Sequence, residues 1–240
     1  MKILPNDIHL VLLPGLDGTG YLFKPFIEQC ANPNKIITIS YPTDHFIPFK
    51  ELPKYIIPKL PKDQPLVLLG ESYSGPVAAL LATNHKLDVR GVIFVATFAR
   101  YPKSFLKTLS QVLPLSWLLK LPIPNSVIRL FCFGKWNTAT LSNLLKESIK
   151  ANQPKILTQR ARSGTSLDVR DVLSKIDAPC LYIQASKDKL VPDKAIEDFK
   201  THIRDLAIHR VEGAHFILQT QPGNCSRIVA DFVKQCALIQ

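Results

Sequence analysis

Short runs of apolar residues recur along the chain, and helix-like segments separate several of them. The runs that we predict to be β-strands cover residues 8–13, 35–40, 66–69, 91–96, 181–185 and 207–211. Strands that alternate with helices are typical of a mostly parallel sheet with helices on both faces. Such sheets bind their ligands at the carboxyl ends of the strands. The pattern therefore predicts an α/β fold with a functional site at that edge of the sheet.

The alternation stops after the fourth predicted strand. Residues 100–175 are rich in leucine and broken by proline, as in the stretch from Val112 to Pro122. We interpret this segment as helices inserted into a single domain, 1–240, whose core consists of residues 1–99 and 176–240. The alternative is that these helices belong to the ordinary core.

The third predicted strand runs into a serine between small residues, in the sequence G-E-S-Y-S-G that begins at Gly70. This pattern is typical of a nucleophile elbow, a strained turn that lifts a serine hydroxyl clear of the sheet. The usual form is G-x-S-x-G, and here Ser74 stands at the second glycine position, with Gly75 one place later. We predict that Ser72 is a nucleophile; the alternative is a strand-to-helix turn without chemistry.

A serine nucleophile needs a base to take its proton and a carboxylate to orient that base. His215 follows a predicted strand and a glycine-containing turn, and Asp188 lies in a polar loop after an apolar run. Both side chains are therefore expected at the carboxyl ends of strands, on the same edge as Ser72. The remaining histidines lack this setting, and we expect them to be structural or solvated: His9, His45, His85, His202 and His209.

With Ser72, Asp188 and His215 in this chain order, the sequence resembles an α/β-hydrolase over nearly its whole length. The resemblance implies an acyl-enzyme mechanism that needs no metal or organic cofactor. It also implies that the segment 100–175 is a helical lid over the active site, because such hydrolases carry their lids at this place.

The same resemblance assigns the glycine-rich loop after the first strand to the oxyanion hole. The backbone N–H groups of Leu16 and Tyr73 would then bind the developing negative charge. Many relatives have a histidine before the first glycine of this loop, where this chain has Pro14. The loop glycines do not have the G-x-G-x-x-G spacing of a dinucleotide site.

Composition limits the remaining possibilities. The 240 residues, 46% of them hydrophobic, suit one compact domain. The first residues reach charge and proline too soon for a signal peptide, and no apolar run has the length of about 18 residues that a membrane span requires. The five cysteines show no metal-ligand spacing, and their odd number indicates a reducing compartment. We expect a cytoplasmic protein without a metal site.

Positive charge is concentrated in the predicted lid. Residues 100–175 hold 13 of the 30 lysines and arginines and only 3 of the 19 acidic residues. A basic surface attracts anionic partners. An acyl carrier protein, an anionic membrane surface and a small acidic substrate all fit, and solubilising charge is a fourth explanation. Nucleic acid is disfavoured because no binding motif accompanies the charge.

A small hydrolase with a basic helical lid is similar to the pimeloyl-[acyl-carrier protein] methyl ester esterases of biotin synthesis, which dock a carrier protein on the lid. That resemblance implies cleavage of a methyl ester on a carrier-linked acyl chain. The lid residues that we expect to contact substrate or partner are Trp117, Arg129, Arg160 and Arg162. A general carboxylesterase, a thioesterase, a lipase at a membrane, or a binding protein without catalysis remain alternatives.

Overall fold

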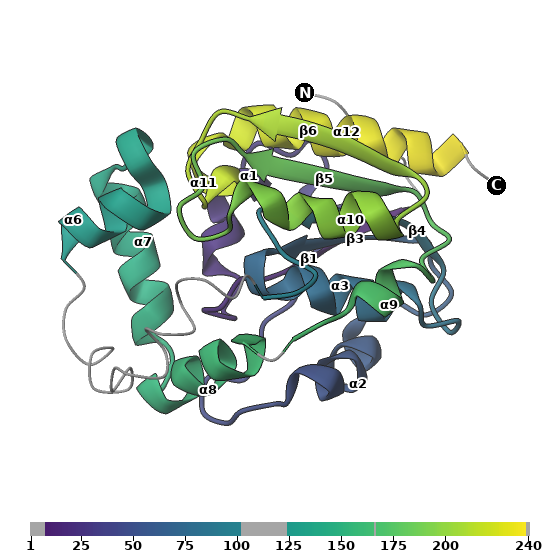
Figure 1. Ribbon diagram of the computed structural model, residues 1–240, viewed down its shortest axis with the longest axis horizontal. Coiled ribbons are helices and arrows are strands. Elements are labelled where there is room, and N and C mark those ends of the chain that lie inside the picture. The colour runs from purple at the N-terminus through teal and green to yellow at the C-terminus, as the bar shows by residue number, and fades with distance from the viewer. Residues whose placement is uncertain (1–7, 102–123, 166, 239–240) are drawn as a thin grey trace.

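The computed structural model describes residues 8–101, 124–165 and 167–238. Six strands in these residues form one parallel sheet in the order β2-β1-β3-β4-β5-β6 (Figure 1). The strands are β1 (His9–Leu13), β2 (Ile36–Thr38), β3 (Leu66–Glu71), β4 (Val89–Val95), β5 (Cys180–Ala185) and β6 (Leu206–Val211). Each predicted apolar run coincides with one of these strands, so the predicted α/β fold is confirmed.

Alternate residues of a strand point to opposite faces of the sheet. Because both faces carry apolar side chains here, helices cover both. In β1, Leu10 and Leu12 pack with α1 (Lys24–Ile27), α11 (Ile217–Thr220) and α12 (Pro222–Leu238). Val11 and Leu13 pack on the other face, which is covered by α2 (Leu52–Ile56), α3 (Gly75–Ala82), α9 (Arg170–Leu173) and α10 (Ile196–His202). These four β1 side chains are fully buried, as expected for a strand covered on both sides.

Several short 3-10 turns connect these elements. They are η1 (Tyr21–Phe23), η2 (Pro33–Lys35), η3 (Phe49–Glu51), η4 (Ile57–Lys59), η5 (Ser72–Ser74), η7 (Gly134–Trp136) and η8 (Asp193–Ala195). A π-helical stretch, η6 (Arg129–Phe133), follows α6 (Asn125–Ile128).

Between β4 and β5 the chain forms α6, η6, η7, α7 (Ala139–Lys150) and α8 (Pro154–Thr165). Figure 1 shows α6 and α7 beside the sheet rather than on one of its faces. The Thr138 side chain caps α7 by accepting a hydrogen bond from the Leu141 N–H at 3.1 Å. The buried side of α7 carries Leu141 and Leu145, which pack in one apolar cluster with Leu22 of the core. That cluster anchors the inserted helices to the sheet domain.

The two ends of the insertion lie side by side. The Tyr101 N–H donates to the Leu167 carbonyl at 3.3 Å, and the Val169 N–H donates to the Ala99 carbonyl at 3.0 Å. Leu173 of α9 packs in the core cluster with α3 and α10. Residues 167 and 169 therefore lie beside residues 101 and 99, where the insertion is predicted to begin. Residues 102–123, and with them Trp117, lie outside the described residues.

The five cysteines are free thiols. Burial raises the pKa of the Cys30 thiol to about 11 and that of Cys225 to about 12. Both thiols therefore stay protonated, and poorly nucleophilic, near neutral pH. Within the ranges that the structure describes, no helix is both long and apolar enough to cross a membrane.

Candidate active site

Ser72 lies where β3 turns into α3, in a left-handed backbone conformation with a φ of 51°. Such strain is characteristic of a nucleophile elbow. The turn is tight on both sides. A methyl group at Gly70 would overlap the Ser74 carbonyl, and one at Gly75 would overlap the Thr97 side chain. Gly70 and Gly75 are thus the two glycines that the elbow needs.

Ser74 and Pro14, the two departures from the usual family pattern, contact each other. The buried Ser74 hydroxyl donates to the Pro14 carbonyl. The Tyr41 hydroxyl lies 2.6 Å from the Ser74 Oγ and therefore acts as the donor to it. This chain of hydrogen bonds joins the elbow to the loop that follows β1. No sequence motif indicated Tyr41.

The structure brings Ser72, His215 and Asp188 together. The His215 Nε2 lies 2.9 Å from the Ser72 Oγ, and the His215 Nδ1 lies 2.8 Å from the Asp188 Oδ2. The other carboxylate oxygen, Oδ1, accepts the backbone N–H groups of Leu190 at 2.8 Å and Val191 at 2.9 Å. These bonds orient the carboxylate so that it accepts the Nδ1–H of the imidazole. The lone pair of Nε2 then faces the serine, as a general base requires.

A second carboxyl group, that of Glu71, is buried directly before Ser72 in the chain. Glu71 accepts hydrogen bonds from the Gln219 amide at 3.0 and 3.3 Å. Burial raises the pKa of Glu71 to about 7, although the bond from Gln219 and the charge of His215 oppose that rise. Sequence reasoning missed both residues; the position of Glu71 directly before the nucleophile was the only available signal.

Burial by itself would lower the pKa of His215. The charge of Asp188, its hydrogen bond and the charge of Glu71 act in the opposite direction and leave the pKa of His215 above its usual value. The imidazolium form of His215 is therefore favoured at this position.

The loop after β1 passes close to the nucleophile. A Cβ added at Gly15 would lie 3.9 Å from the Ser72 Cβ. The Gly18 N–H donates to the Gly15 carbonyl at 3.1 Å, which closes a turn with Leu16 inside it, and Gly18 has a φ of 71° that favours glycine. Leu16, 40% exposed, therefore lies in a loop that passes close to Ser72, and Tyr73 directly follows Ser72 in the chain.

Arg160, which we predicted to contact substrate or partner, is buried instead. Its side chain is only 3% exposed. The guanidinium donates to the carbonyls of Asp17 at 2.7 Å and Pro42 at 2.6 Å, and to the Asn152 Oδ1 at 3.1 Å. Residues 100–175 are rich in positive charge, but Arg160 contributes to internal hydrogen bonds and not to the surface. The other two predicted arginines, Arg129 and Arg162, are exposed.

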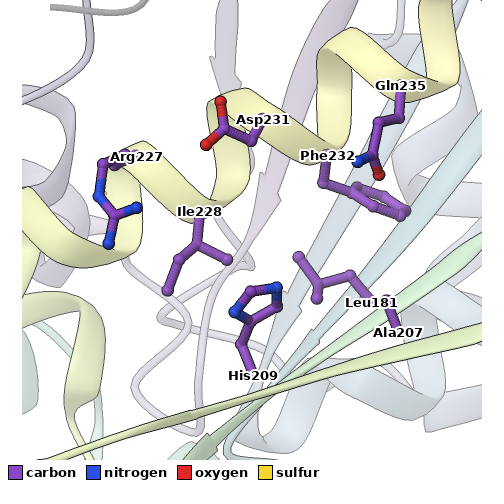
Figure 2. Close-up of a pocket in the computed structure, with 8 residues that line it drawn as sticks. All are labelled: Leu181, Ala207, His209, Arg227, Ile228, Asp231, Phe232 and Gln235. Atoms are coloured by element: carbon purple, nitrogen blue, oxygen red, sulfur yellow. The ribbon is translucent and has the colours of Figure 1, made fainter.

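His209 lines a cavity between β6 and α12 (Figure 2). The other lining residues are Leu181, Ala207, Arg227, Ile228, Asp231, Phe232 and Gln235. In the part of the chain that the structure describes, no three histidine, cysteine, aspartate or glutamate side chains gather as metal ligands would.

Solved structures with the same fold include proteins that are named as different enzymes. An esterase from Exiguobacterium antarcticum superposes with a TM-score of 0.77 at 18% identity, covering 98% of this chain and 94% of that one. An enol-lactonase from Burkholderia xenovorans LB400 gives a TM-score of 0.76 at 15% identity, with 96% and 92% coverage. At these identities the similarity establishes the α/β-hydrolase fold alone.

Sequence comparison is more specific. A pimeloyl-[acyl-carrier protein] methyl ester esterase of Neisseria meningitidis is 25% identical over 195 residues, which are 72% of this chain and 71% of the relative. Residues 49–218, from the start of η3 into α11, match the family described as "Serine aminopeptidase, S33". Since this match spans more than half of the chain and the fold agrees, the protein belongs to this family of α/β-hydrolases.

Proposed function

We propose that this hydrolase cleaves carboxylic esters through an acyl-enzyme formed on Ser72. The observation that carries the proposal is the pair of hydrogen bonds that join His215 to Ser72 at 2.9 Å and to Asp188 at 2.8 Å. Nucleophile, base and orienting carboxylate are thus within hydrogen-bond distance, as acyl transfer requires.

The geometry supports the following steps. His215 Nε2 takes the proton of the Ser72 hydroxyl while the oxygen attacks the ester carbonyl carbon. The backbone N–H groups of Leu16 and Tyr73 stabilise the oxyanion. His215 then donates its proton to the leaving alcohol, and the acyl group remains on Ser72. Water, deprotonated by His215, then attacks the acyl carbon. His215 returns this proton to the Ser72 oxygen as the bond to the acyl group breaks and the acid leaves. Asp188 stays ionised throughout and stabilises the imidazolium.

For the substrate, we propose a methyl ester on an acyl chain that is carried by an acyl carrier protein. The Neisseria relatives bear that name. The basic surplus of residues 100–175, which includes the exposed Arg129 and Arg162, supports an acidic partner. The same triad would also cleave thioesters, so the substrate depends on what the lid admits.

Substitution of the nucleophile tests the proposed reaction. Ser72→Ala should lower the hydrolysis of p-nitrophenyl butyrate on the order of 10⁶-fold, because the triad acts as a unit. Ser174→Ala, at an exposed position, is the matched control and should keep the wild-type rate. Turnover by Ser72→Ala that equals the wild-type rate would show that the chemistry does not occur at this serine.

A further inference from the structure

A buried cation ties the inserted helices to the loop that follows β1. Arg160 lies on α8, and its Nη1 donates to the carbonyls of Asp17 at 2.7 Å and Leu16 at 3.2 Å. Its Nη2 donates to the Pro42 carbonyl at 2.6 Å. A methyl group at Gly18 would overlap the guanidinium, so the loop packs directly against the arginine. The planar guanidinium spans two segments of the core that are far apart in sequence.

Together with a backbone hydrogen bond, these bonds hold the turn from Gly15 to Gly18 in place. The Gly15 carbonyl accepts the Gly18 N–H at 3.1 Å, and the next two carbonyls, of Leu16 and Asp17, accept Arg160. The Asn152 amide, which also holds Arg160, donates to the Asp17 carbonyl at 2.8 Å. Three consecutive peptide groups are therefore held by hydrogen bonds. The first of them consists of the Gly15 carbonyl and the Leu16 N–H.

The same helix also contacts Tyr73, the residue that follows Ser72. The Tyr73 hydroxyl lies 3.3 Å from the Ser163 Oγ, and Ser163 in turn donates to the Arg160 carbonyl at 2.8 Å. Helix α8 therefore contacts both residues whose N–H groups would bind the oxyanion.

We infer that Arg160 is a positioning residue that holds the Leu16 N–H in place for the oxyanion. The inference rests on the proposed ester hydrolysis and adds a role for a lid residue that never touches the substrate. An oxyanion-hole donor acts only where it is already aimed at the developing charge. A misplacement of about 1 Å in such a site costs about 10²-fold in rate.

The experiment compares Arg160→Met and Arg160→Lys with the wild type on p-nitrophenyl butyrate. Active sites are counted by the final extent of labelling with a fluorophosphonate, and kcat is expressed per labelled site. Arg160→Met should lose about 10²-fold in kcat with KM nearly unchanged, since the oxyanion exists only in the transition state. Arg160→Lys keeps the charge but not the planar fork, and its kcat should fall between the two. Arg204→Met, an exposed arginine near the amino end of β6, is the matched control.

A purely structural role predicts a different result: fewer labelled sites and a lower Tm, with wild-type kcat per site. That result in either variant would overturn the inference. If Arg160→Met does not fold, Arg160→Lys decides, because its ammonium still donates to the buried carbonyls. A wild-type protein that does not hydrolyse the ester would instead refute the proposed function, so the two failures are distinguishable.

Discussion

The buried Glu71 is a second carboxyl group whose charge acts on His215. Two carboxylates, Asp188 and Glu71, raise the pKa of His215 against the effect of burial. Of these two carboxylates, Asp188 is the one that is hydrogen-bonded to the His215 imidazole. Glu71 instead contacts Gln219, so it influences the base through its charge and not through orientation. The two carboxylates can therefore be separated by experiment.

For these residues we predict a shift in the pH dependence of kcat/KM. His215 must be neutral to accept the serine proton, so kcat/KM should fall as the pH drops through the pKa of His215, which lies above its usual value. Glu71→Gln removes a charge that favours the imidazolium and should move this acid limb to lower pH. The measurement is kcat/KM against pH. Glu212→Gln, an exposed glutamate paired with Lys135, is the control, and an unmoved or raised midpoint in Glu71→Gln contradicts the prediction.

Among the secondary-structure elements, the elbow and α3 are held by close backbone packing. Gly75 begins α3, and its Cα faces the Thr97 side chain, which also donates to the Ser72 carbonyl. The strained conformation of Ser72 is thus stabilised from the strand side and the helix side together. Gly70, Gly75 and Thr97 together stabilise this turn, and Thr97 lies outside the G-x-S-x-G motif.

Gly75→Ala tests this packing. The added methyl group has to displace Thr97 or α3, and overpacking of this kind typically costs about 1–3 kcal/mol. We expect a lower Tm and a loss of esterase activity, because the Ser72 carbonyl loses its fixed position. Gly223→Ala is the matched control near the start of α12, where a new Cβ would meet only the Gln29 side chain at 3.8 Å. Equal Tm values for the two variants would refute this account of the elbow.

For the whole molecule, the distribution of charge is the main feature that bears on partners. The formal net charge is +11, and most of it lies in residues 100–175. Arg160 is committed to internal hydrogen bonds, whereas Arg129 and Arg162 are exposed. Long-range attraction between opposite charges acts on the rate of encounter.

We therefore predict that salt separates two kinds of substrate. Cleavage of a methyl-esterified dicarboxylyl group on acyl carrier protein should weaken as salt shortens the Debye length from about 30 Å at 0.01 M to about 8 Å at 0.15 M. A small free methyl ester of the same acid should be cleaved at a rate that salt hardly changes. Arg129→Glu should lower kcat/KM for the carrier-linked ester, with Arg204→Glu as control. Equal salt dependence for both substrates would argue against a carrier dock.

Much of the fold could be predicted because its signals are local. Each strand is a short apolar run, and parallel strands buried on both faces require such runs wherever the sheet lies. The settings of Ser72, Asp188 and His215 are also local, since each follows a strand end. The structure brings these three side chains together, and their catalytic role is the proposal that Ser72→Ala tests.

What the sequence determined by itself is therefore the order of the elements, the elbow and the identity of the triad candidates. Tertiary structure alone decided which charges are exposed. Arg160 and Arg162 are two residues apart on one helix, yet the first is buried among carbonyls of the core and the second is exposed. The same holds for Glu71 and Tyr41, whose partners are distant in the chain. Burial and hydrogen bonding between distant segments depend on packing, and no local pattern encodes them.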